Sequence, residues 1–125
     1  MSRPRWPWAP IVVAGIIMLG ATLPGTAVAS LPAGRGPARP LLDQAAHVGP
    51  FLVFAVVTLR AAAPTRSAGR AVGITVVAVS LLALGSETAQ LVVPGRMFDV
   101  LDLVLNGLGG LSGLVLASGA GARGP

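Results

Sequence analysis

The chain has 125 residues, of which 54% are hydrophobic and only 10% are charged, and its mean hydropathy is +0.81. Because soluble domains carry about a quarter charged residues, this composition excludes an ordinary soluble protein and indicates a membrane protein. Cysteine is absent, which excludes disulfides, thiolate metal sites and a cysteine nucleophile. The net charge of +5 comes from scattered arginines, without a basic run or an aromatic platform, so no nucleic-acid partner is expected.

The first 31 residues contain a short tail and the first expected span. Residues 1–8 are basic, and we expect them to form a cytoplasmic tail. The apolar stretch that follows predicts a span at about 10–31, since a helical crossing needs about 20 residues, and Pro24-Gly25 predicts a bend within it. The small residues at 27–30 also fit the cleavage site of a signal peptide, and the composition of this region leaves both interpretations open.

The second expected span, at about 44–62, begins with a polar turn. Asp43 and His47 are four residues apart, so their side chains lie on the same face of a helix. Pro50 is expected within or near the first turns of this helix, where its missing N–H is least costly.

The third expected span, at about 71–93, is almost entirely apolar until its C-terminal end. Glu87 and Gln90 are spaced i, i+3 there and share one face. A Pro-Gly pair then ends the helix with a turn that leads to Arg96.

The fourth expected span, at about 99–118, carries a single stripe of polar and small residues. Successive members are three, four, three and four residues apart, which is helical spacing; they are Asp99, Asp102, Asn106, Gly109 and Gly113. The two glycines form a G-x-x-x-G pair that allows close helix contact, which we expect to be intramolecular. Residues 119–125 are expected to form a flexible C-terminal tail. The predicted fold is therefore all-α, a polytopic membrane protein with four transmembrane helices in a small bundle.

The distribution of arginines predicts the orientation of these spans. With four spans, one side carries arginines 3, 5, 60, 66, 70 and 123, and the other carries arginines 35, 39 and 96. Because positive residues concentrate on the cytoplasmic side, both termini of this multi-pass cell-membrane protein are predicted to be cytoplasmic. All four acidic residues and the only histidine then converge near the extracytoplasmic surface.

The polar residues follow the pattern of a known family. Over roughly residues 20 to 115, the motifs Asp43 with His47, Glu87-x-x-Gln90, Pro94-x-Arg96 and Asp102-x-x-x-Asn106-x-x-Gly109-x-x-x-Gly113 resemble the VanZ-like membrane proteins. Pro24-Gly25 resembles the end of that family's first helix, which favours a retained span over a signal peptide. Val48 departs from the pattern, because the family usually has an aromatic residue after the histidine. The resemblance implies a small integral protein of the cell envelope, and the namesake of the family is associated with low-level resistance to the glycopeptide teicoplanin.

A carboxylate inside an apolar helix near the membrane centre costs about 2.5–3.5 kcal/mol, and three main hypotheses account for such charges here. A proton relay is a fourth, which is disfavoured because the polar residues stop near one surface instead of crossing the membrane. The residues concerned are Asp43, His47, Glu87, Gln90, Arg96, Asp99, Asp102 and Asn106. The first is a structural network in which Arg96 pairs with Glu87 or Asp102. The second is a site in which Arg96 holds a phosphate or carboxylate of an envelope lipid or glycopeptide.

The third hypothesis is a membrane-embedded hydrolase or transferase that uses the clustered carboxylates as general acid and base, or to hold a hard metal ion. No nucleophile motif or metal-ligand spacing supports a particular reaction, so no metal or cofactor is expected. Among functions, we expect binding or shielding of an envelope component in preference to catalysis. The expected partners are membrane lipids and such an envelope lipid or glycopeptide; the sequence does not predict an oligomeric state.

Overall fold

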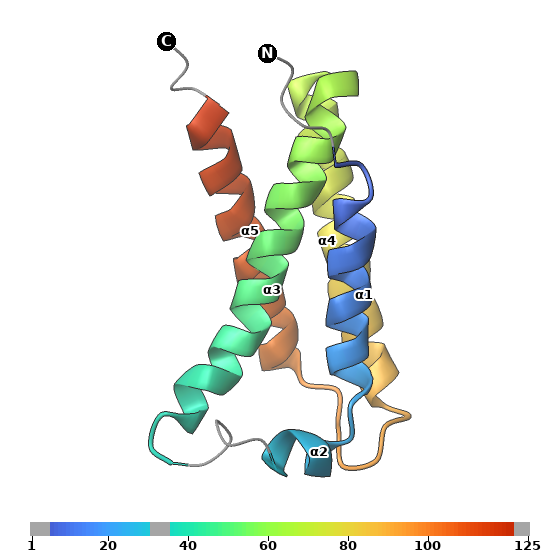
Figure 1. The fold of residues 1–125 in the computed structure, drawn as a ribbon, viewed down its shortest axis with the longest axis vertical. Helices are drawn as coiled ribbons and strands as arrows, with labels where there is room; N and C mark the ends of the chain where they lie inside the picture. Colours follow the sequence, from blue (N-terminus) through green and yellow to red (C-terminus); the bar gives the residue numbers. More distant parts are fainter. Residues whose placement is uncertain (1–5, 31–35, 122–125) are drawn as a thin grey trace.

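The computed structural model describes residues 6–30 and 36–121, and every regular element within these residues is helical (Figure 1). In chain order the elements are α1 (Ala9–Thr22), α2 (Gly25–Ser30), α3 (Arg39–Ala62), the 3-10 turn η2 (Ala63–Thr65), α4 (Ala68–Gln90) and α5 (Val100–Gly121). The predicted all-α fold class is confirmed. In the part of the chain described, three segments are long and apolar enough to cross a membrane, namely Arg39–Thr65, Ala68–Gln90 and Val100–Gly119. The structure is thus a small helical membrane bundle.

The expected first span is divided between two helices. Helix α1 has 14 residues, and at 1.5 Å per residue it is about 21 Å long, against about 30 Å for the hydrocarbon core of a bilayer. It ends because the residue before a proline avoids the helical conformation, and Leu23 is accordingly extended with ψ 134°. After Pro24 the chain continues as α2, which crosses the lower end of the bundle in Figure 1. The predicted bend is present. Within the described residues, three helices are long and apolar enough to cross a membrane, and α1 is a shorter apolar helix.

Helix α3 begins at Arg39, earlier than the expected position 44, and this changes the place of Pro50. A proline already occupies the first turn of α3, where its fixed φ favours helix initiation. Pro50 therefore lies in the helix interior, and the prediction that it falls within or near the first turns was wrong. Because proline has no N–H, the carbonyl of Ala46 lacks its usual partner within the helix.

The C-terminal ends of α4 and α5 also differ from the expected bounds. Helix α4 ends at Gln90, where we expected residue 93, and α5 continues to Gly121, into the segment expected to be a tail. Residues 1–5, 31–35 and 122–125, which belong to the predicted tails and the first loop, lie outside the described residues.

Helices α3 and α5 form the most extensive pair in the bundle. Their backbones approach closely at two glycines of α5. A Cβ added at Gly109 would lie 3.0 Å from the Cα of Val48 and closer still to its carbonyl oxygen, and a Cβ at Gly113 would lie 2.9 Å from the Cβ of Ala55. Helix α1 packs on α3 and α4, and the apolar core lies between these helices; its buried members are Ile17, Phe51, Phe54, Ala55, Val79 and Ala83.

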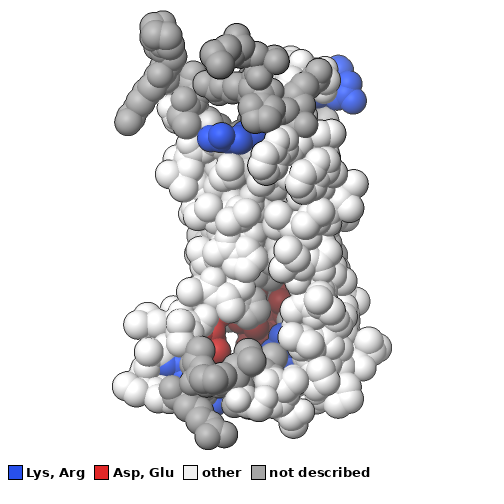
Figure 2. Space-filling view, viewed as in Figure 1, with Lys and Arg blue, Asp and Glu red and all other residues white. Residues whose placement is uncertain are grey.

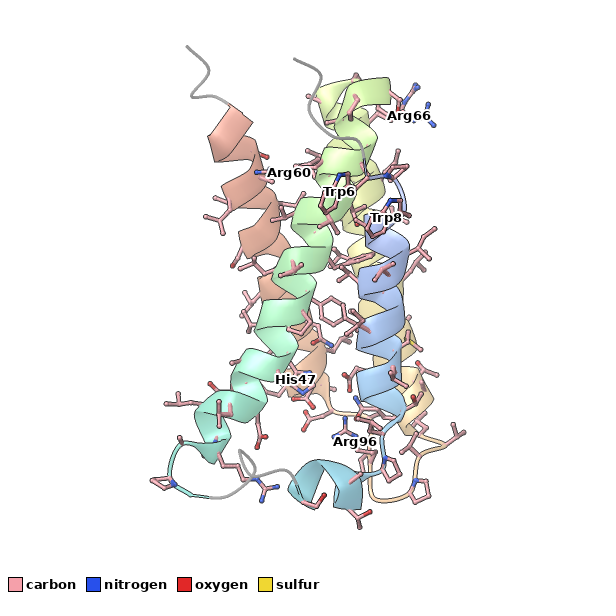
Figure 3. The ribbon with its side chains drawn as sticks, viewed as in Figure 1. Trp6, Trp8, His47, Arg60, Arg66 and Arg96 are labelled. Carbon is pink, nitrogen blue, oxygen red and sulfur yellow. The ribbon has the colours of Figure 1, made fainter. Side chains whose placement is uncertain are left out.

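The two ends of the bundle carry different side chains (Figure 3). Arg60 and Arg66 lie at the upper end, near the connection between α3 and α4. His47 and Arg96 lie toward the lower end, where α4 ends and α5 begins. The polar residues of three helices are therefore brought to one end, below the apolar core.

Candidate functional site: a polar cavity at one end of the bundle

A cavity of about 660 Å³ lies at the lower end of the bundle, between α1 and α3. Its lining also includes residues of α4, of α5 and of the turn that joins them. In Figure 2 the molecule is hollowed at this end, and acidic side chains are visible inside the hollow. We call this space the polar cavity. It has room for a molecule much larger than a water or an ion.

Glu87 holds the end of α4 against the start of α5. Its side chain is 1% exposed. Its Oε1 accepts hydrogen bonds from Gln90 Nε2 at 3.2 Å and from Asn106 Nδ2 at 3.3 Å, and its Oε2 accepts one from the backbone N–H of Asp99 at 3.4 Å. Three donors therefore compensate a carboxylate that has been removed from water, as a buried acidic group requires.

Asn106 connects this carboxylate to His47. It is also 1% exposed, and its Oδ1 lies 3.1 Å from Nδ1 of His47 on α3. Since its Nδ2 donates to Glu87, the amide orientation is set and Oδ1 must be the atom that faces the imidazole. Nδ1 of His47 then carries the proton and donates it to Asn106.

The second imidazole nitrogen faces Asp102. His47 Nε2 lies 3.3 Å from Oδ2 of Asp102, and both side chains are partly exposed to the polar cavity, at 22% and 28%. A continuous chain of contacts thus runs from Glu87 through Asn106 and His47 to Asp102, and it joins α4, α5 and α3.

Arg96 lines the polar cavity from the turn between α4 and α5. The turn depends on Gly95, whose φ of 75° is readily adopted only by glycine. The Nε of Arg96 is buried and has no hydrogen-bond partner among residues 6–30 and 36–121.

The pairing of Arg96 with Glu87 or Asp102, which the structural hypothesis offered, does not occur among the described residues. Glu87 is already bonded by amide and backbone donors, and Asp102 faces His47. In the described part of the chain, the network across the helices is therefore organised by Asn106 and His47.

Two of the predicted site residues lie apart from this network. Asp43 is at the edge of the polar cavity, where it is exposed and pairs with Arg39 Nε at 3.6 Å. The Asp99 side chain caps α5, because its Oδ1 accepts the backbone N–H of Leu101 at 2.7 Å. Only the backbone of Asp99 reaches Glu87.

Sequence reasoning overlooked two features of the cavity. Arg39 is one, and its i, i+4 spacing to Asp43 was a signal that could have identified it. The apolar wall is the other. Phe51 follows His47 by four residues and so shares its face of the helix, whereas nothing in the spacing of Ile16 and Ile17 distinguishes them from ordinary core or lipid-facing residues.

The turn that carries Arg96 is held in place by α2. The backbone N–H of Gly25 donates to the carbonyl of Pro94 at 3.3 Å, and a Cβ at Gly25 would lie 2.5 Å from the carbonyl oxygen of Gly95. Gly25 therefore has no space for a side chain, and Gly95 is required by its positive φ instead. The bend after α1 thus supports the position of Arg96.

One group of residues has side-chain atoms suited to a metal ion. His47, Glu87 and Asp102 each present a ligand atom within 4.8 Å of the others. Glu87 is buried and the other two are half-buried, so the group lies between the network and the open space of the cavity.

Fold and site together define a small helical membrane protein with a polar cavity at one end of its bundle. A family model described as VanZ/LLP1 matches residues 11–121, and the chain belongs to this family. The VanZ family is not known as a family of enzymes. No curated protein and no solved structure matches the chain.

Proposed function

We propose that this VanZ family protein binds the anionic headgroup of an envelope lipid in the polar cavity, with Arg96 as the anchor. The observation that carries the proposal is Arg96 itself: it lines the cavity, it forms no ion pair in the described part of the chain, and its buried Nε has no acceptor there. A buried donor left without a partner costs about 1–3 kcal/mol, and more when the group is charged. A phosphate or carboxylate in the cavity would give this guanidinium an acceptor and a counter-charge.

The guanidinium group suits such a ligand. It is planar and always charged, and its parallel N–H groups can bind two oxygens of a phosphate or carboxylate at once. The other arginine of the cavity, Arg39, is exposed and paired with Asp43. Arg96 is therefore the cation best placed to bind an anion.

The walls of the cavity favour an amphiphile over a fully polar ligand. Ile16, Ile17 and Phe51 form an apolar wall, whereas His47, Asp102 and Arg96 are polar. A lipid whose headgroup contacts Arg96 can place the start of its acyl chains against the apolar wall. The volume of about 660 Å³ lies within the usual range for small-molecule sites, about 300–1,000 Å³. We therefore favour an anionic lipid as the occupant.

We further propose that α1 forms a fourth crossing, with α2 lying across its lower end, and that the cavity opens on the extracytoplasmic side. Helix α1 is apolar and packs on α3 and α4 as a member of the bundle. Arg60 and Arg66 lie at the end opposite to the cavity, and the tendency of arginines to remain cytoplasmic supports this orientation. The cavity would then meet headgroups of the outer leaflet.

Lipid that co-purifies with the protein tests the proposal. Wild type and Arg96→Gln are extracted in mild detergent, and their bound lipids are compared with those of the starting membrane by mass spectrometry. We expect wild type to be enriched in one anionic class, and Arg96→Gln to lose that enrichment. Arg96→Lys should retain only part of it, because lysine keeps the charge without the bidentate geometry.

The matched control is Arg66→Gln, which removes an exposed arginine at the other end of the bundle. It should keep the lipid profile of wild type. Each variant is first shown to be monodisperse and helical, so that lost lipid is not lost structure. An Arg96→Gln protein that is folded and carries the same lipids as wild type would refute the assignment.

A further inference from the structure

The contact between His47 Nε2 and Asp102 Oδ2 needs a proton or a metal cation between the two atoms. Nδ1 of His47 carries a proton because it donates to Asn106, whose orientation is set by its bond to Glu87. Nε2 is then either a second protonated nitrogen or a bare lone pair. It faces a carboxylate oxygen at 3.3 Å, and two acceptors cannot face each other at that distance without a proton or another cation close by.

Glu87 is a second carboxylate close to the contact between His47 and Asp102. Ligand atoms of His47, Glu87 and Asp102 all lie within 4.8 Å of one another, and they come from α3, α4 and α5. Arg96 is the nearby cation of the cavity lining, yet it forms no ion pair with either carboxylate within the described residues. A doubly protonated His47 would offset the charge of Asp102, and Glu87 would then depend on its three hydrogen-bond donors.

We propose that His47 Nε2, Glu87 and Asp102 bind a divalent first-row metal ion such as Zn²⁺ or Mn²⁺. One imidazole and two carboxylates are a donor set for such ions, since imidazole suits Zn²⁺ and carboxylate suits Mn²⁺. Glu87 Oε1 accepts two hydrogen bonds and Oε2 only one, at 3.4 Å, so Oε2 keeps a free lone pair for a metal.

The surroundings match those of a metal centre in two further respects. Metal-binding histidines usually donate their other N–H to a carbonyl-type oxygen, as His47 does to Asn106. Three protein ligands would leave coordination positions open, and all three residues line the polar cavity. Tetrahedral ligands about 2.1 Å from zinc are roughly 3.4 Å apart. His47 Nε2 and Asp102 Oδ2 are already 3.3 Å apart, whereas no pair in the group exceeds 4.8 Å, so the farthest pair would approach by at most about 1.4 Å.

The metal site does not require the proposed lipid. An ion there would add positive charge beside Arg96 and give an anionic headgroup a second contact. The two proposals are nevertheless tested with different probes, and either can fail while the other stands.

Direct binding of Mn²⁺ and Zn²⁺ to the full chain tests the site. The protein is purified in detergent through a tag without histidine and stripped with EDTA; it is then titrated with Mn²⁺, followed by electron paramagnetic resonance, and with Zn²⁺ in competition. The chain has a single histidine and no cysteine, which limits other sites for these ions. We expect one saturable ion per chain in wild type.

The variants assign the ion to these side chains. Asp102→Asn and His47→Gln should weaken binding at least about tenfold, because loss of groups that only orient the ligands already costs 10–100-fold. The matched control is Asp43→Asn, a carboxylate of the same cavity that is exposed and paired with Arg39. It should bind the ion as wild type does.

Two results would overturn the proposal. One is the absence of a saturable site in folded wild-type protein, which would mean that His47 and Asp102 form only an imidazolium–carboxylate pair. The other is an equal loss of affinity in Asp43→Asn and Asp102→Asn, which would assign the binding to general negative charge. Should either ligand variant fail to fold, the wild-type titration still decides whether the ion binds.

Discussion

Replacing Gly109 by alanine should separate α5 from α3 and destabilise the bundle. The added Cβ would lie 3.0 Å from the Cα of Val48 and closer still to its carbonyl oxygen. These are backbone atoms, so they cannot rotate away as the end of a side chain could. The helices must move apart along their most extensive contact, and the polar cavity is lined by both.

The magnitude follows from the contact distance. Carbon atoms in ordinary contact are about 3.5–4.0 Å apart, so the helices must shift by roughly 0.5–1 Å at this point. Overpacking of this kind typically costs about 1–3 kcal/mol, and alanine recovers up to about 1 kcal/mol through its higher helix propensity. We expect Gly109→Ala to lower the free energy of unfolding by about 1–2 kcal/mol.

The control is Gly107→Ala on the same helix. Gly107 is exposed, and a Cβ there meets no atom within 4 Å. This variant should be as stable as wild type or slightly more stable, since only the propensity gain remains. The pair of variants therefore separates the packing of the two helices from a general effect of alanine.

Unfolding of the purified protein by added SDS, followed by far-UV circular dichroism, measures the difference. The loss in Gly109→Ala should not depend on protein concentration, because the contact lies within one chain; a dimer contact would make it concentration-dependent. If Gly109→Ala unfolds at the same SDS fraction as Gly107→Ala, the close packing of α5 on α3 is refuted.

Three further predictions concern orientation, the network and the turn. Single cysteines at Gly36 and Ser67 should differ with a membrane-impermeant reagent: Gly36 reacts in intact cells and Ser67 only after permeabilisation, and the reverse pattern would place the cavity on the cytoplasmic side. Asn106→Ala should cost about 1–3 kcal/mol in SDS unfolding, because His47 and Glu87 both lose a partner; wild-type stability would mean that water replaces the amide. Gly25→Ala should reduce lipid bound through Arg96 without removing α4 or α5, since its Cβ would displace the supporting turn; unchanged lipid content would contradict that role.

The sequence predicted the helices and the polar end of the bundle from two physical facts. A helical crossing must be long and apolar, and α3, α4 and α5 show this directly in their composition. A carboxylate in such a helix is costly unless it faces polar groups, so Glu87 and Asp102 had to face inward at a common depth. Their helical spacing to Gln90 and Asn106 then indicated which neighbours share the same face.

The partners of these side chains were decided by the tertiary structure. Helical spacing defines a face of one helix, but the rotation of that helix against its neighbours selects which atoms meet. The structural hypothesis paired Arg96 with an acidic residue, whereas Asn106 bridges Glu87 to His47 and Asp102 faces the imidazole. The described residues leave the Nε of Arg96 buried without a partner.

The same distinction applies to local signals. The sequence by itself determined that a Pro-Gly pair bends the chain after α1 and that glycines of α5 permit a close contact, because these effects depend on backbone sterics alone. Only the tertiary structure decided that Gly25 packs on the turn carrying Arg96, and that α1 and α3 enclose a cavity with one apolar wall. Cavities form where helices diverge, and divergence depends on the packing of all the helices together, which no single segment specifies.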